Sequence, residues 1–207
     1  YHGLLIAHKD SPYNSVDDVL KNSKNINFSI GDPNSTSGFL VPTFYVFAKN
    51  GVDHRTAFKT VRNASHGANL QAVLAKQVDV ATNNTEDLTK LENTKPELAS
   101  QVKVLWKSPL IPSDPFVWRK DLDPAVKAKI KNFVLGYAKT DAAEKAILKN
   151  IYSYGGFRES NNDQLIPIRQ LELFRDRAKA QADEKLAADE KTRLLADIDR
   201  KLAALGK

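Results

Sequence analysis

The stretch Gly31-Asp32-Pro33-Asn34-Ser35-Thr36-Ser37-Gly38-Phe39 lies between an apolar run, Ile26–Ile30, and an amphipathic segment that begins at Phe39. Its three consecutive hydroxyls, Ser35, Thr36 and Ser37, stand where a helix is expected to begin. The first N–H groups of a helix have no intrahelical acceptor, and the positive end of the helix dipole lies there. N–H and O–H donors can therefore hold a tetrahedral oxyanion together. A serine that only caps a helix explains the same residues, so this stretch by itself leaves both interpretations open.

The same order of strand, polar turn and helix recurs twice further along the chain. Ser65-His66-Gly67 follows a predicted strand at Ala57–Val61, and Asn83-Asn84-Thr85-Glu86-Asp87 follows a predicted strand at Gln77–Thr82. In open parallel α/β sheets, ligands bind beyond the carboxyl ends of the strands, where helices begin. We therefore expect the polar residues of the three turns to converge on one edge of a sheet, namely Ser35, Thr36, Ser37, His66 and Glu86.

Other elements follow from apolar spacing and from helix start and stop signals. Strands are predicted at Gly3–Ala7, Asn25–Ile30, Val102–Lys107 and Phe116–Trp118, and helices at Val16–Leu20, Phe39–Asn50, Asp123–Tyr137 and Ala142–Ile151. Pro42 lies inside the helix at Phe39–Asn50 and predicts a bend or an irregular start there. Pro109, Pro112 and Pro115 stiffen the connection between the last two strands, which we interpret as a hinge.

Beyond Asn161 the sequence becomes rich in Leu, Ala and charged residues, which predicts helices. Leu195, Ile198, Leu202 and Leu205 fall partly at a spacing of three or four, but over fewer heptads than a coiled coil needs. Two interpretations remain open for this tail. It packs on its own domain, or it contacts another protein.

Composition excludes several classes of protein. The 207 residues suffice for one large or two small domains. Lys and Arg number 31 against 25 Asp and Glu, a net charge of +6, but they are spread along the chain, which disfavours nucleic-acid binding. The absence of cysteine excludes disulfides and cysteine-ligated metals. No apolar run is long enough to cross a bilayer. Because the sequence opens directly in an apolar strand, without a signal-like stretch, we expect it to start partway through a larger protein.

Motifs of common enzymes are missing from the sequence. There is no His-x-x-x-His pair, no Gly-x-Ser-x-Gly turn and no glycine-rich loop followed by Lys-Ser or Lys-Thr. Ser37 and His66 remain as a pair that could act as nucleophile and base in a phosphate-ester hydrolase. The preferred prediction is a protein with no catalytic residue, no metal ligand and no cofactor.

Three segments, taken in order, resemble the phosphonate-binding periplasmic proteins of ABC transporters: Gly31–Phe39, Gln77–Glu86 and Lys107–Pro112, with the similarity continuing into Ile166–Leu171. The resemblance covers essentially the whole chain, whereas the N-terminal portion of the family has no counterpart. It implies an α/β fold of the type II periplasmic-binding-protein class, with two lobes joined by a hinge. Residues 1–107 would form the second lobe with the anion site, 108–160 the hinge return and the C-terminal part of the first lobe, and 161–207 the C-terminal helices.

The resemblance also implies roles for individual residues. Tyr1, Ser35, Thr36, Ser37 and His66 match residues that hold the phosphonate group, and Glu86 and Asp114 match carboxylates that hold the amino end of an aminoalkylphosphonate. The protein would capture alkyl- or aminoalkylphosphonates such as 2-aminoethylphosphonate in the periplasm and deliver them to an ABC transporter permease. A homodimer through the C-terminal helices is a further expectation.

Two alternatives share the same fold: a ligand-sensing domain, and a binding protein for another phosphorus oxyanion such as phosphate or phosphite. The carboxylates of Glu86 and Asp114 favour the aminoalkylphosphonate, because they attract an ammonium group and repel a second phosphate-like group. With much of one lobe lacking a counterpart, we expect the chain by itself to bind weakly or not at all, and to expose apolar surface.

Overall fold

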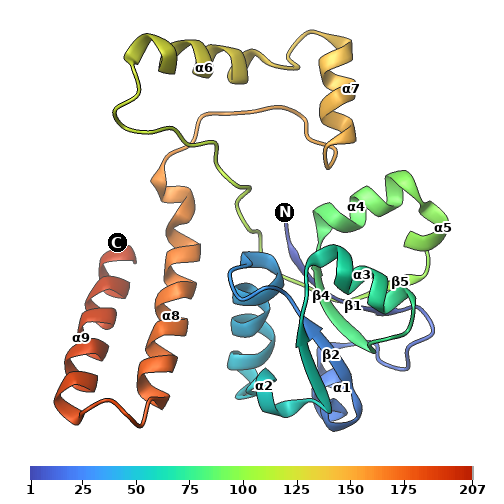
Figure 1. Cartoon of the computed structure of the whole chain (residues 1–207), viewed down its shortest axis with the longest axis vertical. Helices are drawn as coiled ribbons and strands as arrows, with labels where there is room; N and C mark the ends of the chain where they lie inside the picture. The colour runs from blue at the N-terminus through green and yellow to red at the C-terminus, as the bar shows by residue number, and fades with distance from the viewer. Residues whose placement is uncertain (207) are drawn as a thin grey trace.

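The computed structural model describes residues 1–206, and its centre is a mixed sheet with the strand order β3-β2-β4-β1-β5 (Figure 1). The strands are β1 Gly3–His8, β2 Asn27–Ile30, β3 Thr60–Asn63, β4 Val80–Asn84 and β5 Val102–Lys107. β2 pairs in parallel with β3 and β4, whereas β1 is antiparallel to β4 and β5. The expectation of a parallel sheet is therefore correct for β2, β3 and β4 and wrong for β1. The reversal brings the start of β1 to the edge where β4 ends, because Gly3 pairs with Asn84.

β1 runs through the middle of the core, and all six of its residues are buried. Its side chains alternate between the two faces of the sheet. Leu5 and Ala7 join one apolar cluster, with Phe28 of β2, while Leu4 and Ile6 join the other. Burial on both faces explains why this strand reads as a continuous apolar run in the sequence.

Short helices follow the strands, and polar side chains cap several of their first turns. Ser65 Oγ accepts a hydrogen bond from the N–H of Ala68 at the start of α3, and Asn84 Oδ1 accepts one from the N–H of Asp87 at the start of α4. These caps satisfy donors that the helix leaves free. The helices of this part are α1 Val16–Lys21, α2 His54–Ala57, α3 His66–Leu74, α4 Thr85–Thr94 and α5 Pro96–Ala99.

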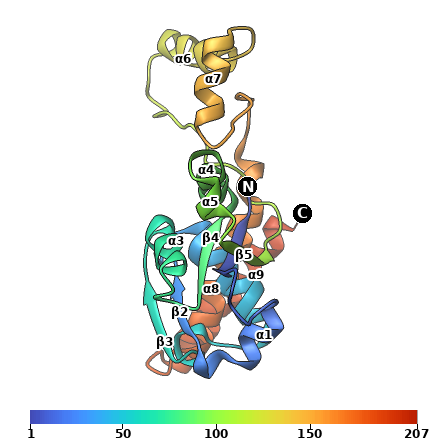
Figure 2. The same ribbon diagram turned by 90° about the vertical axis from the view of Figure 1, so that its right-hand side faces the viewer.

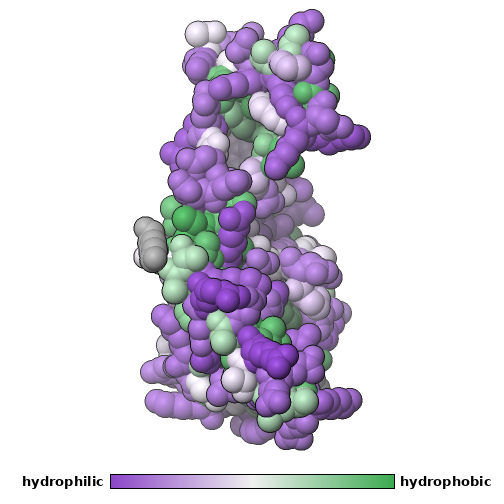
Figure 3. All heavy atoms as spheres, turned by 90° about the vertical axis from the view of Figure 1, so that its left-hand side faces the viewer, coloured by the Kyte–Doolittle hydropathy of each residue, from purple (hydrophilic) through white to green (hydrophobic). Residues whose placement is uncertain are grey.

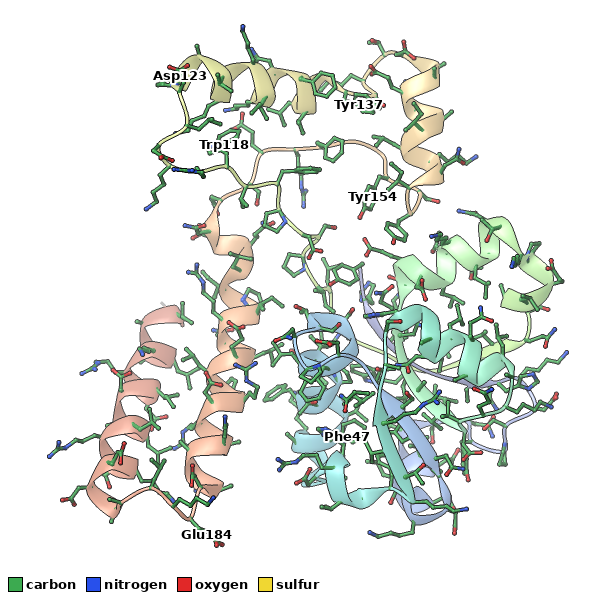
Figure 4. All side chains as sticks on the ribbon, in the orientation of Figure 1. Phe47, Trp118, Asp123, Tyr137, Tyr154 and Glu184 are labelled. Carbon is green, nitrogen blue, oxygen red and sulfur yellow. The ribbon has the colours of Figure 1, made fainter. Side chains whose placement is uncertain are left out.

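The stretch Gly31–Phe39, which we call the oxyanion stretch, runs into an irregular helix, as Pro42 predicts. This helix consists of two π-helical turns, η2 Thr36–Leu40 and η3 Thr43–Phe47, followed by a 3₁₀ turn, η4 Ala48–Asn50. Proline has no N–H for the helical ladder, and wider turns accommodate the missing bond. Phe47 at its end, labelled in Figure 4, packs edge-on against Phe28 with ring centres 5.4 Å apart.

Two strand predictions are displaced in the structure. Residues Ala57–Val61 do not form one strand, because Ala57 ends helix α2 and the strand begins at Thr60. Asp53 caps that helix by accepting the N–H of Arg55, a local signal that outweighs the apolar residues. The strand predicted at Gln77–Thr82 begins only at Val80 and runs to Asn84, since the N–H of Gln77 still bonds to the carbonyl of Ala72.

Residues 112–161, which we call the outer segment, stand apart from the sheet in two perpendicular views (Figures 1 and 2). The outer segment contains α6 Pro124–Gly136 and α7 Ala142–Asn150, close to the helices predicted there. Figure 4 labels Trp118 and Tyr137 in it, and Figure 3 shows hydrophobic residues reaching the surface at this end of the molecule. The expectation of exposed apolar surface agrees with 78% exposure of Phe116 and 67% of Phe133.

The predicted strand at Phe116–Trp118 is wrong. These residues are extended but pair with no strand in the part of the chain that the structure describes. A β-strand needs a neighbour for its N–H and C=O groups. The local pattern of bulky residues indicates an extended backbone but cannot supply that neighbour.

The C-terminal helices form an antiparallel pair, visible in Figure 1. After a 3₁₀ turn, η5 Asn162–Leu165, α8 Ile166–Ala182 packs on the α/β part and α9 Ala188–Leu205 packs on α8. Leu171 of α8 lies in an apolar cluster with Leu40, Val41 and Ile111, and the ring of Phe174 stacks on Phe44. Packing on its own domain is thus the arrangement of α8, while a homodimer through these helices stays a prediction.

Candidate functional site

The carboxyl ends of β2 and β4 and the start of the antiparallel β1 meet at one edge of the sheet (Figure 1). β2 leads into the turn that carries Ser35–Ser37, and β4 leads into α4 with Glu86. α3, which begins at His66, follows the parallel strand β3. The topology therefore brings the sequence-predicted turns together, as the rule for open α/β sheets predicts.

The oxyanion stretch is held tightly against the end of β2. The N–H of Gly31 donates to the carbonyl of Gly38 over 2.9 Å, and the hydroxyl of Thr82 donates to the same carbonyl over 2.7 Å. A Cβ atom on Gly31 would lie 2.6 Å from the carbonyl carbon of Gly38. Only glycine permits this approach.

The hydroxyls of the stretch have different surroundings. Ser35 Oγ accepts the N–H of Gly38 over 3.0 Å, so this side chain caps the first π turn. Thr36 is half-buried at the first position of that turn. Ser37 is 3% exposed, and its Oγ lies 3.0 Å from His66 Nε2 and 3.4 Å from the amide Nδ2 of Asn84. Three elements thus meet at the Ser37 hydroxyl.

His66 is the first residue of α3 and is half-buried. Burial lowers the pKa of His66 below its ordinary value of 6.5, while the nearby carboxylates of Asp87 and Glu86 oppose this shift. The imidazole is therefore mainly neutral at pH 7. A neutral imidazole offers one donor and one acceptor, so it can exchange its contact with Ser37 for one with a ligand.

Tyr1 lies at the same edge because β1 is reversed. Its amino group donates to the carbonyl of Ile111 over 3.0 Å, and the N–H of Ile111 donates back to the carbonyl of Tyr1 over 2.8 Å. Burial raises the pKa of the Tyr1 phenol, a hydrogen bond with Ser37 offsets part of that rise, and the carboxylates of Asp114 and Glu86 add to it. The phenol thus stays protonated at neutral pH and is a donor.

The two predicted carboxylates approach the site from different segments. Glu86 is in the first turn of α4, and Asp114 is exposed in the proline-rich part of the outer segment. Both raise the pKa of Tyr1, and both also raise that of Tyr154. Each carboxylate is therefore near enough to the Tyr1 phenol to disfavour its ionisation.

Sequence reasoning missed Tyr154. Its phenol donates to Glu86 Oε1 over 3.0 Å from the turn after α7. The turn Tyr152–Phe157 is recognisable in the sequence as aromatic and glycine-rich, but nothing in that pattern connects it with Glu86.

Two absences concern the part of the chain that the structure describes. Among residues 1–206, no group of His, Asp and Glu side chains is placed to hold a metal ion. None of the helices within that range combines the length and the apolar character needed to cross a membrane.

Residues 1–165 match the family model described as ABC transporter, phosphonate, periplasmic substrate-binding protein. This match covers well over half of the chain, so the chain belongs to that family of substrate-binding proteins. Over 207 residues it is 47% identical to the phosphonates-binding periplasmic protein of Escherichia coli (strain K12), in a match covering 100% of this chain and 60% of that protein. The chain thus spans 60% of the length of this curated relative.

Solved structures are similar in fold. The binding protein component of an ABC phosphonate transporter from Pseudomonas aeruginosa is 50% identical with a TM-score of 0.89, over 100% of this chain and 68% of that one. A structure of PhnD1 from Prochlorococcus marinus (MIT 9301) in complex with methylphosphonate has a TM-score of 0.69 at 22% identity, over 84% of this chain and 66% of that one, and shares the fold. The predicted family and the mixed α/β fold of periplasmic binding proteins are confirmed. The division into lobes at residues 107 and 160 stays a prediction.

Proposed function

We propose that the protein containing this chain captures alkyl- and aminoalkylphosphonates in the periplasm and passes them to the permease of an ABC importer, without catalysing a reaction. One observation carries the proposal: the neutral donors Ser37 and His66 meet at the edge of the sheet where α4, which carries Glu86, begins. Ser37 Oγ lies 3.0 Å from His66 Nε2. The carboxylates of Glu86 and Asp114 both raise the pKa of the Tyr1 phenol.

The donors suit a phosphonate group. Ser35, Thr36 and Ser37 stand at the start of the π turn, where the first backbone N–H groups of a helix lack an intrahelical acceptor. Such neutral donors hold a doubly charged oxyanion without burying a positive countercharge. Tyr1 and His66 complete the group of donors that we assign to the phosphonate.

The carboxylates suit an amino group at the far end of the ligand. Glu86 and Asp114 would attract an ammonium ion and repel a ligand with a second anionic end. We therefore propose 2-aminoethylphosphonate as the preferred class of ligand, over methylphosphonate, phosphate and phosphite.

Calorimetry tests this proposal. The protein, with any sequence that naturally precedes Tyr1 restored, is titrated with 2-aminoethylphosphonate, methylphosphonate, phosphate and phosphite, beside the 207-residue chain alone. Glu86→Ala should weaken the binding of 2-aminoethylphosphonate much more than the binding of methylphosphonate. The matched control is Glu97→Ala, because Glu97 is an exposed acid in the first turn of α5. This variant should change the affinity for neither ligand. Absence of heat with every phosphonate would refute the substrate assignment.

One contact favours a second candidate function. Ser37 Oγ and His66 Nε2 are 3.0 Å apart, within reach for a nucleophile and its base. A phosphate-ester hydrolase would release p-nitrophenol from p-nitrophenyl phosphate and lose this activity in Ser37→Ala. A protein that binds phosphonates but shows no turnover would exclude this candidate.

A further inference from the structure

Tyr154 connects the outer segment to Glu86, the carboxylate that we assign to the amino end of the ligand. Figure 4 labels Tyr154 at the turn that follows α7, on the side that faces α4. Its phenol donates to Glu86 Oε1 over 3.0 Å, between residues 68 positions apart in the sequence. Tyr154 is half-buried, although the residues on both sides of it are exposed.

The backbone of this turn is shaped to deliver the contact. Tyr152 and Ser153 both have left-handed backbone angles, with φ of 51° and 58°. Residues with side chains avoid this region, and those that occupy it cluster at functional positions. The turn is closed by the N–H of Tyr154, which donates to the carbonyls of Leu148 and Ile151. A regular continuation of α7 would direct these side chains elsewhere.

A neighbouring contact reaches the same helix. The amide Nδ2 of Asn93, near the end of α4, donates to Ser153 Oγ over 3.2 Å. Consecutive residues of the turn thus contact the first and the last turns of α4. This pair of contacts fixes the turn relative to the whole helix that carries Glu86.

The chemistry of the two side chains fixes the direction of the hydrogen bond. Burial and the hydrogen bond to Glu86 raise the pKa of Tyr154 to about 12, so the phenol remains a donor at any physiological pH. A carboxylate has two oxygens, each able to accept more than one hydrogen bond. Because Tyr154 occupies Oε1 and restricts the rotation of the side chain, Oε2 is presented in a defined direction.

We propose that Tyr154 is a positioning residue, which orients the Glu86 carboxylate toward the amino end of the ligand and so sets the preference for aminoalkyl- over alkylphosphonates. This inference rests on the proposed function. It adds a residue of the outer segment to the determinants of specificity.

The test compares Tyr154→Phe with Tyr152→Phe. Both variants keep an aromatic ring, and Tyr152 is an exposed neighbour that makes no hydrogen bond to Glu86 in the described structure. Each is titrated with 2-aminoethylphosphonate and with n-propylphosphonate, which has the same shape but no ammonium group. Tyr154→Phe should lower the affinity for 2-aminoethylphosphonate about tenfold, because it removes one hydrogen bond to a charged group. Binding of n-propylphosphonate should not change, and Tyr152→Phe should affect neither ligand.

A double-mutant cycle separates positioning from a general structural effect. In a Glu86→Gln background, Tyr154→Phe should no longer alter the ratio of the two affinities, because the carboxylate that it orients is gone. An equal loss for both ligands, or an unchanged ratio in Tyr154→Phe, would overturn the inference while leaving the proposed function intact. If the unaltered protein binds phosphonates without preferring the amino compound, this inference and the preference for 2-aminoethylphosphonate fail, whereas phosphonate capture stands.

Discussion

Ser37 Oγ and His66 Nε2 lie 3.0 Å apart, although they come from turns that follow different strands of the sheet. This contact joins the oxyanion stretch to the start of α3. The two side chains satisfy each other's hydrogen-bonding groups in the structure. If a phosphonate binds here as proposed, it would replace that contact, so substitutions of both residues test the site.

Ser37→Ala should weaken the binding of methylphosphonate and of 2-aminoethylphosphonate by the same factor. The variant removes one donor to a charged group, worth roughly 1.5–3 kcal/mol of binding free energy. Calorimetry with both ligands measures the two losses. Ser100→Ala, an exposed hydroxyl after α5, is the control and should have no effect. A loss confined to the amino compound would contradict the assignment of Ser37 to the phosphonate group.

Binding of a phosphonate should be accompanied by proton uptake at His66. Burial lowers the pKa of His66 below 6.5, and an anion bound beside the imidazole would raise this pKa again. The bound state then holds more protons than the free state at a pH between the two values, so affinity increases as pH falls through this interval.

Calorimetry near pH 6.5, the ordinary pKa of histidine, in two buffers of different ionisation enthalpy detects this uptake. The observed heat should depend on the buffer, and the dependence should be smaller in His66→Gln, where only the phosphonate itself can take up a proton. The same buffer dependence in both proteins would show that His66 does not titrate with binding.

Gly31→Ala should damage both the fold and the site. The new Cβ would lie 2.6 Å from the carbonyl carbon of Gly38, so the oxyanion stretch must move. Forced overpacking of this kind costs about 1–3 kcal/mol of unfolding free energy. Urea denaturation measures the loss. Gly136→Ala, where an added Cβ meets nothing within 4 Å, should leave stability nearly unchanged, and equal effects of the two variants would argue against this close approach.

Truncation of Phe28 should lower the free energy of unfolding, whereas truncation of Val117 should hardly change it. Phe28 is fully buried, so Phe28→Ala should cost roughly 3–5 kcal/mol of unfolding free energy. Val117 is 84% exposed, so Val117→Ala should change stability by less than about 0.5 kcal/mol. Chemical denaturation of the 207-residue chain measures both. A large loss in Val117→Ala would mean that the outer segment is packed in solution.

Much of the fold could be predicted because the local signals are strong. The run Gly3–Ala7 is apolar at every position but the first, and it forms a strand buried on both faces. Asp123-Pro124 begins α6 as predicted, since proline suits the first turn of a helix. β3 was misplaced because its residues are polar and largely exposed at the edge of the sheet, which weakens the strand signal.

The candidate site was predictable as far as it follows from strand ends. Ser37, His66 and Glu86 each stand in the first turn of a helix that follows a strand, where ligand-binding residues of open α/β sheets are expected. The contribution of Tyr154 was not predictable in this way. Its partner, Glu86, is 68 residues away, and the left-handed turn that aims it has no glycine at Tyr152 or Ser153 to signal it.

The paired backbone hydrogen bonds between Tyr1 and Ile111 have a topological consequence. Residues 1 and 111 lie side by side, so the two ends of the segment that contains the whole sheet are adjacent. This segment could therefore be transplanted into a surface loop of an unrelated protein without stretching the backbone at either junction. The sheet and the hydroxyl and imidazole groups at its edge would then be transferred together.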